Sequence, residues 1–337
     1  MKDIIVAGCA ILDIIKQIDV YPQPTSLARI KNQNIAVGGA LCNTGVDLKK
    51  LCPDLNIKTI GVLGNDSNGA FVIDCLKKNN IDISLMSTID LPTGYTDVMN
   101  ESNGRRTFFH NQGANATLTE KHFESLTSEN TELVHIGYLL LLDYLDSNDD
   151  EYGTKMARLL HSLQEKGIKT SIDVVSEDSE RFMKIVPPSL KYCDYVVMNE
   201  FEGGRITQIN PRNQDGSLNI KNLKKILVEM KKLGVKRKAV IHCPECGAII
   251  DENNEICVVP SLDLPKDYIK SSVGAGDAFA AGCLLGFMKG YDNEYILRLS
   301  SCASALNLSV VDSISGGKNE KETIVLENTY KRRSELC

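Results

Sequence analysis

The amino-acid sequence predicts an α/β protein with a doubly wound, mostly parallel sheet flanked by helices and with a small β-sheet lid. Short apolar runs alternate with longer segments of helical spacing, which is typical of a parallel sheet with helices on both faces. The apolar runs are continuous, as expected of strands that are covered on both faces. Two segments break this rhythm and predict a second, smaller sheet.

The expected strands and helices of the main layer alternate along the chain. Strands are predicted at residues 3–8, 57–64, 132–138, 168–175, 193–199 and 237–242. Helices are predicted at residues 38–51, 67–79, 150–167 and 220–234. The last two helices end in lysines followed by Gly167 and Gly234, and glycine is the residue that most often terminates a helix.

The two segments without a helical pattern are residues 14–37 and 91–112. The first contains Pro22 and Pro24, and the second is predicted to form two short strands joined by the turn ESNGR. If the segments pair with each other, they form a small sheet over the carboxyl edge of the main sheet, where doubly wound folds bind ligands. We therefore expect a single domain, residues 1–337, that carries this small sheet as a lid.

Composition and charge argue against several classes of protein. The chain has 337 residues, of which 42% are hydrophobic and 24% charged, which is typical of a folded domain. Its net charge of -6 gives no broad positive field for nucleic acid, and its apolar runs are too short to span a bilayer. The start of the chain lacks the pattern of a signal peptide. We expect a cytoplasmic protein without nucleic-acid or membrane partners.

Eleven cysteines are scattered along the chain, and we expect most of them to be buried, reduced thiols. Cys243 and Cys246, in the stretch HCPEC, have the spacing of zinc ligands, and His242 precedes them. A closed zinc site needs four ligands, and the sequence has no second C-x-x-C. We therefore interpret HCPEC as a turn between two strands.

The stretch SSVGAGDAFAAG predicts an anion-binding helix start. Residues Ala275 to Met288 suit a buried helix, with Gly274 and Gly276 at its entrance. The first turn of a helix has unpaired N–H groups and partial positive charge, and glycines let a phosphate approach this backbone closely. Asp277 then has two interpretations. It either stabilises the helix as an N-terminal charge or takes a proton from an attacking hydroxyl.

The stretch MNEFEGG follows an apolar run and carries a second candidate site. Asn199 and Glu202 are three residues apart, so they share one face of a starting helix. Alone, this pattern is more typical of a helix cap than of a metal site. Beside a phosphate site, however, these oxygens suit a magnesium ion that accompanies a nucleotide.

The stretch VGGALCNTG places Gly38 and Gly39 at a strand-to-helix junction, with Asn43 one turn later. A tight turn with an ordinary cap is an equally good interpretation of this pattern alone. Asp13 follows the first apolar run by a few residues. Its carboxylate can accept hydrogen bonds from a polyol.

Together and in this order, these motifs resemble the PfkB or ribokinase-like family of carbohydrate and nucleoside kinases. The resemblance covers nearly the whole chain and includes a G-N-D-x-x-G block at Gly64–Gly69; the G-A-G-D block is its most specific part. The P-loop pattern is absent, and Phe279 takes the third glycine position of a dinucleotide-binding fingerprint. The resemblance implies an ATP-dependent kinase with a doubly wound sheet and a β-lid, which often mediates dimerisation.

The resemblance also implies roles for the matching residues. Asp277 matches the catalytic base, and Gly274–Gly276 match the anion hole that stabilises charge on the transferred phosphoryl group. Asn199 and Glu202 match the motif that holds magnesium and the nucleotide phosphates, largely through water.

On the acceptor side, the resemblance assigns Gly38, Gly39 and Asn43 to sugar contacts and Asp13 to the substrate hydroxyls on the opposite side. In the expected lid, NGRRTFFHN places Arg106 near the sugar, where it favours a substrate with a carboxylate or phosphate. The alternative is that Arg106 lies on a solvated face of the small sheet.

The chain departs from the family pattern at two places. Ser271 stands where the family usually has an Asp that often helps to bind a monovalent cation, which leaves potassium activation an open question. In the nucleotide loop, HCPECG replaces the common T-x-G-x-x-G. His242 takes the threonine position, Pro244 the first glycine position, and Gly247 is retained. Proline removes a backbone donor, so the nucleotide preference is also open.

The leading hypothesis is a kinase that uses ATP and Mg²⁺ to phosphorylate a hydroxyl of a small sugar. A nucleoside kinase of the same family is an alternative, with Tyr95, Phe108 and Phe109 as a stacking wall. A non-catalytic sugar-binding relative is another, supported by the altered nucleotide loop and Ser271. The intact G-A-G-D and N-x-x-E motifs favour the kinase.

Overall fold

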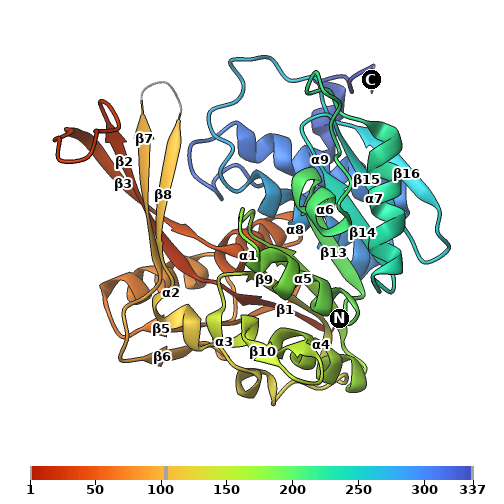
Figure 1. The fold of residues 1–337 in the computed structure, drawn as a ribbon, viewed down its shortest axis with the longest axis horizontal. Helices are drawn as coiled ribbons and strands as arrows, with labels where there is room; N and C mark the ends of the chain where they lie inside the picture. Colours follow the sequence, from red (N-terminus) through yellow and green to blue (C-terminus); the bar gives the residue numbers. More distant parts are fainter. Residues whose placement is uncertain (1, 102–104, 335–337) are drawn as a thin grey trace.

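The computed structural model describes residues 2–101 and 105–334. It contains a large sheet flanked by helices and a separate small sheet, as the sequence predicts (Figure 1). Residues 102–104 of the predicted turn ESNGR lie outside the described residues.

The main sheet has eight strands, of which the six from β14 to β4 are parallel. In spatial order they are β16 (Ile256–Pro260), β15 (Cys246–Ile250), β14 (Lys238–His242), β13 (Tyr195–Asn199), β12 (Lys169–Val174), β9 (Thr131–Leu139), β1 (Asp3–Gly8) and β4 (Ile57–Ile60). The strands β15 and β16 add an antiparallel edge. The sheet is therefore mixed but mostly parallel, as predicted.

Helices cover both faces of this sheet. One face carries α4 (Lys155–Glu165), α5 (Arg181–Leu190), α6 (Glu200–Thr207) and α7 (Ile220–Lys232). The other carries α1 (Ala40–Leu51), α2 (Ser67–Lys78), α8 (Ala275–Lys289) and α9 (Asn293–Leu308). The short helical segments are α3 (Asp143–Asp146), α10 (Glu320–Ile324), η1 (Gly113–Thr117), η2 (Glu120–Phe123) and η3 (Val325–Asn328).

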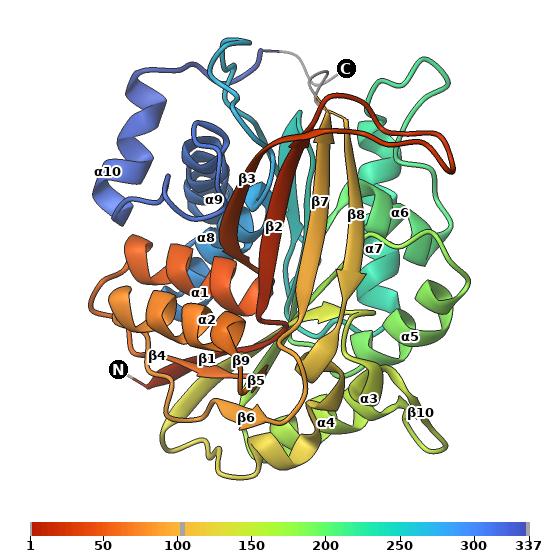
Figure 2. The same cartoon turned by 90° about the vertical axis from the view of Figure 1, so that its left-hand side faces the viewer.

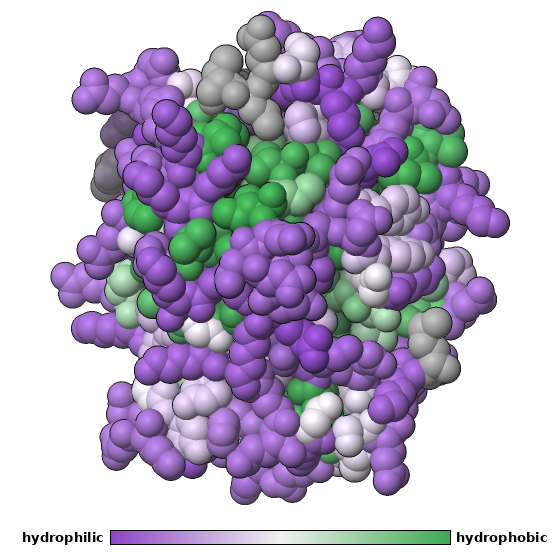
Figure 3. Space-filling view, turned by 90° about the vertical axis from the view of Figure 1, so that its right-hand side faces the viewer, coloured by the Kyte–Doolittle hydropathy of each residue, from purple (hydrophilic) through white to green (hydrophobic). Residues whose placement is uncertain are grey.

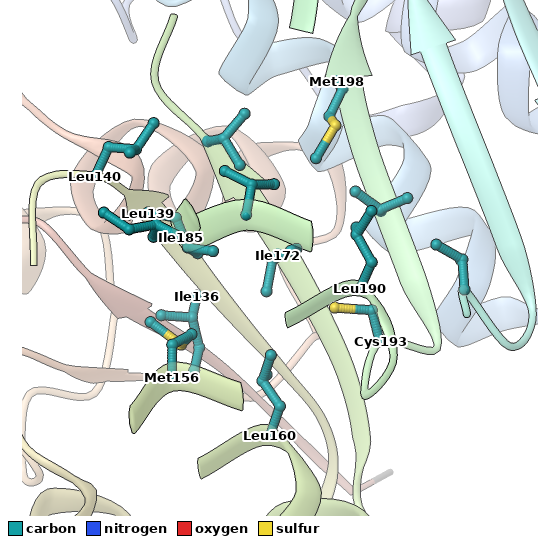
Figure 4. Packing of buried hydrophobic residues seen from close by; sticks show 14 of the residues in the cluster. Ile136, Leu139, Leu140, Met156, Leu160, Ile172, Ile185, Leu190, Cys193 and Met198 are labelled. Carbon is teal, nitrogen blue, oxygen red and sulfur yellow. The ribbon is translucent and has the colours of Figure 1, made fainter. Parts of the chain in front are cut away.

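The α4–α7 side of the sheet shows why these segments are helical. Met156 and Leu160 of α4 are one turn apart and fully buried, and both point toward Ile136 and Ile172 of the central strands (Figure 4). Apolar side chains at this spacing form one stripe along a helix. Burial of that stripe against continuous apolar strands stabilises the layer.

Two predicted elements have different bounds in the structure. The apolar run 57–64 is not one strand, because the chain leaves β4 at Gly61 and continues as β5 (Val62–Gly64), which pairs with β6 (Ser87–Ile89). The helix predicted at 150–167 begins at Lys155. The preceding residues form the hairpin of β10 (Asn148–Asp149) and β11 (Gly153–Thr154), and the Thr154 hydroxyl then caps α4.

The small sheet combines the two segments that lack a helical pattern. Its order is β3 (Ile30–Gly38), β2 (Ile11–Ile18), β7 (Tyr95–Glu101) and β8 (Arg106–Asn111). The segments meet through the parallel pair β2 and β7, which confirms that they pair with each other. Figures 1 and 2 show this sheet standing beside the main body rather than continuing the large sheet.

The G-N-D-x-x-G block fixes the start of β7. Asp66 caps α2 by accepting from the N–H of Gly69 at 2.8 Å. It also accepts from the N–H of Thr93 at 2.8 Å and from its hydroxyl at 2.7 Å. One carboxylate therefore joins the helix that follows β5 to the segment that enters the small sheet.

The side of the molecule that carries the edge strand β16 is mostly hydrophilic, and hydrophobic residues gather in its upper half (Figure 3). An isolated β-bridge between Leu262 and Arg332 joins the segment after β16 to the C-terminal segment. Among the described residues, no helix combines the length and the apolar character that crossing a membrane requires.

Candidate active site

Asp277 lies in the first turn of α8, where it accepts three side-chain hydrogen bonds. The Tyr138 hydroxyl donates to Oδ1 at 2.6 Å, Thr44 Oγ1 donates to Oδ1 at 3.3 Å, and Asn43 Nδ2 donates to Oδ2 at 2.9 Å. These donors come from β9 and α1, so three elements fix one carboxylate. Asp277 is 5% exposed, and this burial raises its pKa although the three donors oppose the shift.

The backbone before Asp277 forms an open helix N-terminus. Gly274 has φ of 77° and packs on Ser313, which lies 2.7 Å from where a Cβ would be, so only glycine fits. The first helical bond runs from the N–H of Ala278 to the carbonyl of Gly274 at 2.9 Å. The N–H groups of Gly276 and Asp277 therefore precede the intrahelical ladder, as an anion site requires, whereas the Ala275 N–H donates to the carbonyl of Ser272 at 3.4 Å.

Asp13 approaches Asp277 from β2 of the small sheet, and the region that these two carboxylates border is called the cleft below. It pairs with Ala36 on β3 and with Thr96 on β7, which places it in the middle of this sheet. Burial, and secondarily the nearby charge of Asp277, raises the pKa of Asp13 to about 6. Two carboxylates, one from the small sheet and one from helix α8, thus face one region.

The two glycines predicted to contact a sugar make room for their neighbours. A Cβ on Gly38 would lie 2.4 Å from Oδ2 of Asp13, so Gly38 clears the space that this carboxylate occupies. Gly39 is the N-cap of α1 with φ of 84°, and a Cβ there would lie 2.4 Å from the carbonyl oxygen of Cys9. Both glycines therefore border the Asp13 side of the cleft.

Asn43 has both ends of its amide engaged. Its nitrogen donates to Asp277, and its oxygen accepts from Ser313 Oγ at 2.8 Å. Asn43 is 4% exposed. The structure thus places the predicted sugar-contacting amide against the predicted base.

One face of the small sheet is directed toward this cleft. Asp13 pairs with Thr96, and Thr96 pairs with His110, so these side chains share one face. Alternate residues of a strand lie on the same face, so Phe108 and Arg106 also belong to the Asp13 face. Phe108 is 59% exposed there.

Arg106 contacts the loop that enters α8. Its Nη2 donates to Ser271 Oγ at 3.2 Å, and the same oxygen accepts from the N–H of Val273 at 3.2 Å. Ser271 is 3% exposed. A guanidinium from the small sheet therefore lies beside the residue that departs from the family pattern.

Asn199 and Glu202 form a complete capping box at the start of α6. Asn199 Oδ1 accepts from the Glu202 N–H at 2.9 Å, and Glu202 Oε2 accepts from the Asn199 N–H at 2.9 Å. Asn199 Nδ2 at 2.7 Å and Ser176 Oγ at 2.6 Å also donate to Glu202 Oε1. Burial raises the pKa of Glu202 to about 7. The helix-cap interpretation is therefore confirmed for these residues.

The stretch HCPEC is a hairpin turn between β14 and β15, as predicted. His242 and Phe279 have ring centroids 5.1 Å apart, and a Cβ on Gly276 would lie 3.5 Å from the imidazole. Burial lowers the pKa of His242 to about 4, so its imidazole is neutral near pH 7. His242, Cys243 and Pro244 line a cavity together with Phe279.

Gly247 lies beneath this cavity in β15. A Cβ there would lie 3.0 Å from Phe279 Cζ and 3.1 Å from Leu297 Cδ2. Gly247 therefore packs against Leu297 and against Phe279, which lines the cavity.

Sequence reasoning missed two donors to Asp277 and one further carboxylate. Tyr138 and Thr44 donate to Asp277. Asp173, near the end of β12, has its pKa raised well above the usual range by burial and by the charges of Glu202 and Asp277. Tyr138 and Asp173 each lie near the carboxyl end of a central strand, which was the signal that could have identified them.

The model of the pfkB family of carbohydrate kinases matches residues 1–320. A ribokinase of Arabidopsis thaliana is 23% identical over 96% of this chain and 80% of its own length. A nucleoside kinase of Methanocaldococcus jannaschii is 24% identical over 87% of this chain and 86% of its own.

Solved structures show the same fold. The structure of Arabidopsis thaliana ribokinase complexed with ribose and ATP matches with a TM-score of 0.78 and 20% identity, over 96% of this chain and 98% of that chain. A ribokinase of Thermotoga maritima matches with the same TM-score and 17% identity, over 97% of this chain and 100% of that chain. These matches confirm the predicted fold. Because the family model matches residues 1–320 of the 337 residues of this chain, the chain belongs to the pfkB family of carbohydrate kinases.

Proposed function

We propose that this kinase transfers the γ-phosphate of ATP to a hydroxyl of a small sugar, with Asp277 as the general base. The observation that carries the proposal is the position of Asp277, a buried carboxylate in the first turn of α8, directly after the glycines of an open helix N-terminus. A base that accepts the proton of the attacking hydroxyl is needed beside the group that receives negative charge.

The N-terminus of α8 supports the other half of the reaction. Charge develops on the phosphoryl oxygens during transfer, and N–H groups fixed in advance stabilise it without reorganisation. We assign this role to the backbone of Gly274, Ala275 and Gly276. Their position directly before Asp277 puts the anion site and the base within one helical turn.

The acceptor is assigned to the space between the two sheets. Asp13 offers carboxylate oxygens to substrate hydroxyls. Because Gly38 has no side chain, it leaves room for that carboxylate. Asn43 and Gly39 border the same space from the start of α1. Arg106, which reaches Ser271 from the small sheet, favours an acceptor that carries a carboxylate or phosphate. The small sheet then acts as a lid that excludes water.

Magnesium is the cation that this chemistry implies, and its ligands here would be amide and carboxylate oxygens, largely through water. Glu202 and Asp173 are carboxylates whose pKa values are raised by burial, and the charge of Glu202 further raises that of Asp173. Magnesium prefers oxygen ligands and retains several waters. Asn199 and Glu202 would hold the ion, with Asp173 beside them. The ion would neutralise charge on the nucleotide phosphates.

The nucleotide is assigned to the cavity beside the turn of β14 and β15. His242, Pro244 and Phe279 line this cavity, and His242 also approaches Gly276 of the anion site. A nucleotide whose adenine ring binds in this cavity would direct its phosphates to the N-terminus of α8. Gly247 supports the cavity by leaving space for the Phe279 ring.

The outer face of the small sheet supports a homodimer. Strand alternation puts Met99 and Phe109 on the face opposite Asp13. Together with Ile18 and Ile30 they line a surface cavity of about 540 Å³. Because such apolar surface favours association, we propose that two copies pair through this sheet.

The direct test measures ADP formation from Mg²⁺-ATP with a panel of sugars, sugar acids and nucleosides. We expect ADP to form in the presence of one class of acceptor and an equal amount of phosphorylated acceptor to appear by mass spectrometry. ADP without phosphorylated acceptor identifies simple ATP hydrolysis. No turnover with any acceptor, while ADP still binds, contradicts the proposed reaction for the panel tested.

One observation favours a nucleoside as the acceptor. Phe108 is 59% exposed on the sheet face that also carries Asp13, which is the position required for stacking on a base. Base–aromatic stacking is worth about 1–3 kcal/mol. If the acceptor is a nucleoside, Phe108→Ala should raise its KM about tenfold or more. Phe71→Ala, which removes an exposed phenylalanine of α2 outside the small sheet, is the matched control. Equal effects of both substitutions contradict a stacking role.

A further inference from the structure

The turn between β14 and β15 brings two thiols together. Cys243 and Cys246 are opposite each other, next to the paired residues His242 and Gly247. The N–H of Cys243 donates to the carbonyl of Cys246 at 2.9 Å, and the two Sγ atoms are 3.7 Å apart. Residues opposite each other in such a pair have Cα atoms about 5.5 Å apart. A disulfide spans Cα separations of about 4.4–6.8 Å, so this backbone can accept one.

The two thiols differ in access. Cys243 is half-buried and lines the cavity assigned to the nucleotide, whereas Cys246 is 1% exposed. The contact with Cys243 and burial together raise the pKa of Cys246 far above its usual range. Cys243 is therefore the sulfur that meets a reagent from solution, and Cys246 is placed to react with it afterwards.

The turn also connects two parts of the candidate site. Its Cys243 and Pro244 face the cavity. Its Glu245 accepts from Arg212 Nη1 at 2.6 Å, and Arg212 Nη2 donates to buried Glu200 at 2.5 Å. Glu200 is the first residue of α6 and directly follows Asn199. A change in the shape of this turn therefore acts on the cavity wall and on the ion pairs that reach α6.

We propose that Cys243 and Cys246 form a reversible dithiol–disulfide modification site, and that its oxidised form binds nucleotide more weakly. The second part rests on the proposed function, because it takes the adjacent cavity as the nucleotide site. Formation of the bond brings the sulfurs from 3.7 Å to about 2.05 Å. It also removes the proton with which Cys243 Sγ donates to the Cys246 carbonyl at 3.3 Å.

The oxidant is a low-molecular-weight disulfide, and the exchange takes place in two steps. The Cys243 thiolate attacks one sulfur of the reagent, forms a mixed disulfide and releases one thiolate. Cys246 then loses its proton and attacks the Cys243 sulfur, which releases the second thiolate. The protein dithiol is oxidised by two electrons, the reagent is reduced to two thiols, and the two thiol protons leave with the products.

The first experiment tests the bond itself. The full chain is incubated with oxidised glutathione, its remaining thiols are alkylated, and its peptides are mapped by mass spectrometry. We expect one Cys243–Cys246 link in the wild type and in Cys257→Ser, and none in Cys243→Ser or Cys246→Ser. Glutathione retained on Cys243 without a link, or a zinc ion bound to the pair that prevents the link, overturns the proposal.

The second experiment tests its consequence. ADP affinity is measured by calorimetry for the reduced chain, the oxidised chain and the oxidised chain after dithiothreitol. We expect Kd to rise about tenfold on oxidation and to recover on reduction, a change of about 1.4 kcal/mol. Cys243→Ser, which lacks the accessible thiol and leaves only the buried Cys246, should show the same ADP affinity before and after oxidant treatment. An unchanged Kd in the linked wild-type chain overturns the nucleotide effect. A reduced chain that fails to bind ADP instead contradicts the proposed function, while the peptide map still reports on the thiols.

Discussion

At the end of the cleft that we assign to the acceptor, buried side chains from several elements converge on Asp277, whereas at the end that we assign to the nucleotide a hairpin turn forms the wall. Tyr138, Asn43 and Thr44 hold Asp277 in place, and Asp13 enters from a different sheet. The turn at residues 243–246 is fixed by backbone bonds and by one ion pair.

This difference indicates what each end requires. Proton transfer depends on the distance and protonation state of one carboxylate, so its surroundings must be fixed by many contacts. Nucleotide binding is distributed over a larger surface, and single contacts matter less. Substitutions at the acceptor end should therefore act on rate and pH dependence, and those at the nucleotide end on nucleotide affinity.

The largest expected effect is that of Asp277→Asn. An amide has nearly the shape of the carboxylate but cannot accept the proton of the acceptor hydroxyl, so kcat should fall about 10²–10⁴-fold. ADP affinity should change little. Steady-state kinetics and calorimetry measure the two quantities.

The matched control is Asp215→Asn, in an exposed loop, which should leave both quantities unchanged. If Asp277→Asn retains kcat, then Asp277 only stabilises the N-terminus of α8, and the reaction does not require this carboxylate as a base.

Asp13→Asn should act mainly on the acceptor. Hydrogen bonds to a charged group contribute about 1.5–3 kcal/mol, so the acceptor KM should rise about 10–100-fold. The ATP KM should stay the same. Initial rates with each substrate varied in turn separate these effects.

The same variant has a second readout in stability. The raised pKa of Asp13 means that the native state binds this proton more tightly than the unfolded chain, so the free energy of unfolding falls as pH rises from about 4 to about 6. Asp13→Asn should therefore be more stable than the wild type at pH 7, on the order of 1 kcal/mol, and equal to it below about pH 4. Lower stability at pH 7 contradicts this view of the acceptor end.

Tyr138→Phe should shift the pH dependence. The hydroxyl donates to Asp277 and thereby favours the charged carboxylate, so its loss raises the pKa of Asp277. Since the base must be deprotonated, the acid limb of kcat/KM should move to higher pH, on the order of one pH unit. The other carboxyl groups near Asp277 are Asp13, Asp47 and Asp173, and all remain.

Tyr195→Phe is the control, because Tyr195 stacks on Phe287 with ring centroids 4.2 Å apart, and the side-chain donors to Asp277 among the described residues are Tyr138, Asn43 and Thr44. An acid limb that stays in place in Tyr138→Phe assigns that limb to a group other than Asp277.

The smallest effect is expected at the nucleotide end. His242→Ala removes the ring beside Phe279 and should raise the ATP KM a few-fold, about 1 kcal/mol or less. The acceptor KM and the acid limb of the pH profile should not change, because His242 is already neutral near pH 7. A large loss of kcat in this variant would show that the two ends are not separable.

Sequence patterns predicted the layer of strands and helices, the pairing of the two irregular segments and the helix start at Gly274. These features depend on local periodicity and on glycine conformation, both of which are visible in a short stretch. The pattern did not reveal α5, because Pro187 and Pro188 lie inside this helix and proline predicts an interruption.

The contacts of the site were less accessible to sequence reasoning. Tyr138 and Asp277 are 139 positions apart, and Asn43 and Asp277 are 234 apart. Only the folded sheet brings them together, so no local rule predicts that Asn43 donates to Asp277. Gly247 likewise resembles a loop glycine in sequence. It lies within β15, where a Cβ would come within 3.0 Å of Phe279 Cζ.

The parallel pair of β2 and β7 has a consequence for how the molecule assembles. Neighbouring parallel strands cannot be joined by a tight turn, and here β3, α1, β4, β5, α2 and β6 lie between them in the chain. Contacts between distant segments form late, because the loop between them must close first. The Asp13 side of the cleft is therefore completed only after the intervening elements have folded. All of these elements precede α8 in the chain, so a chain that emerges from its N-terminus can complete the small sheet before the helix start at Gly274 exists.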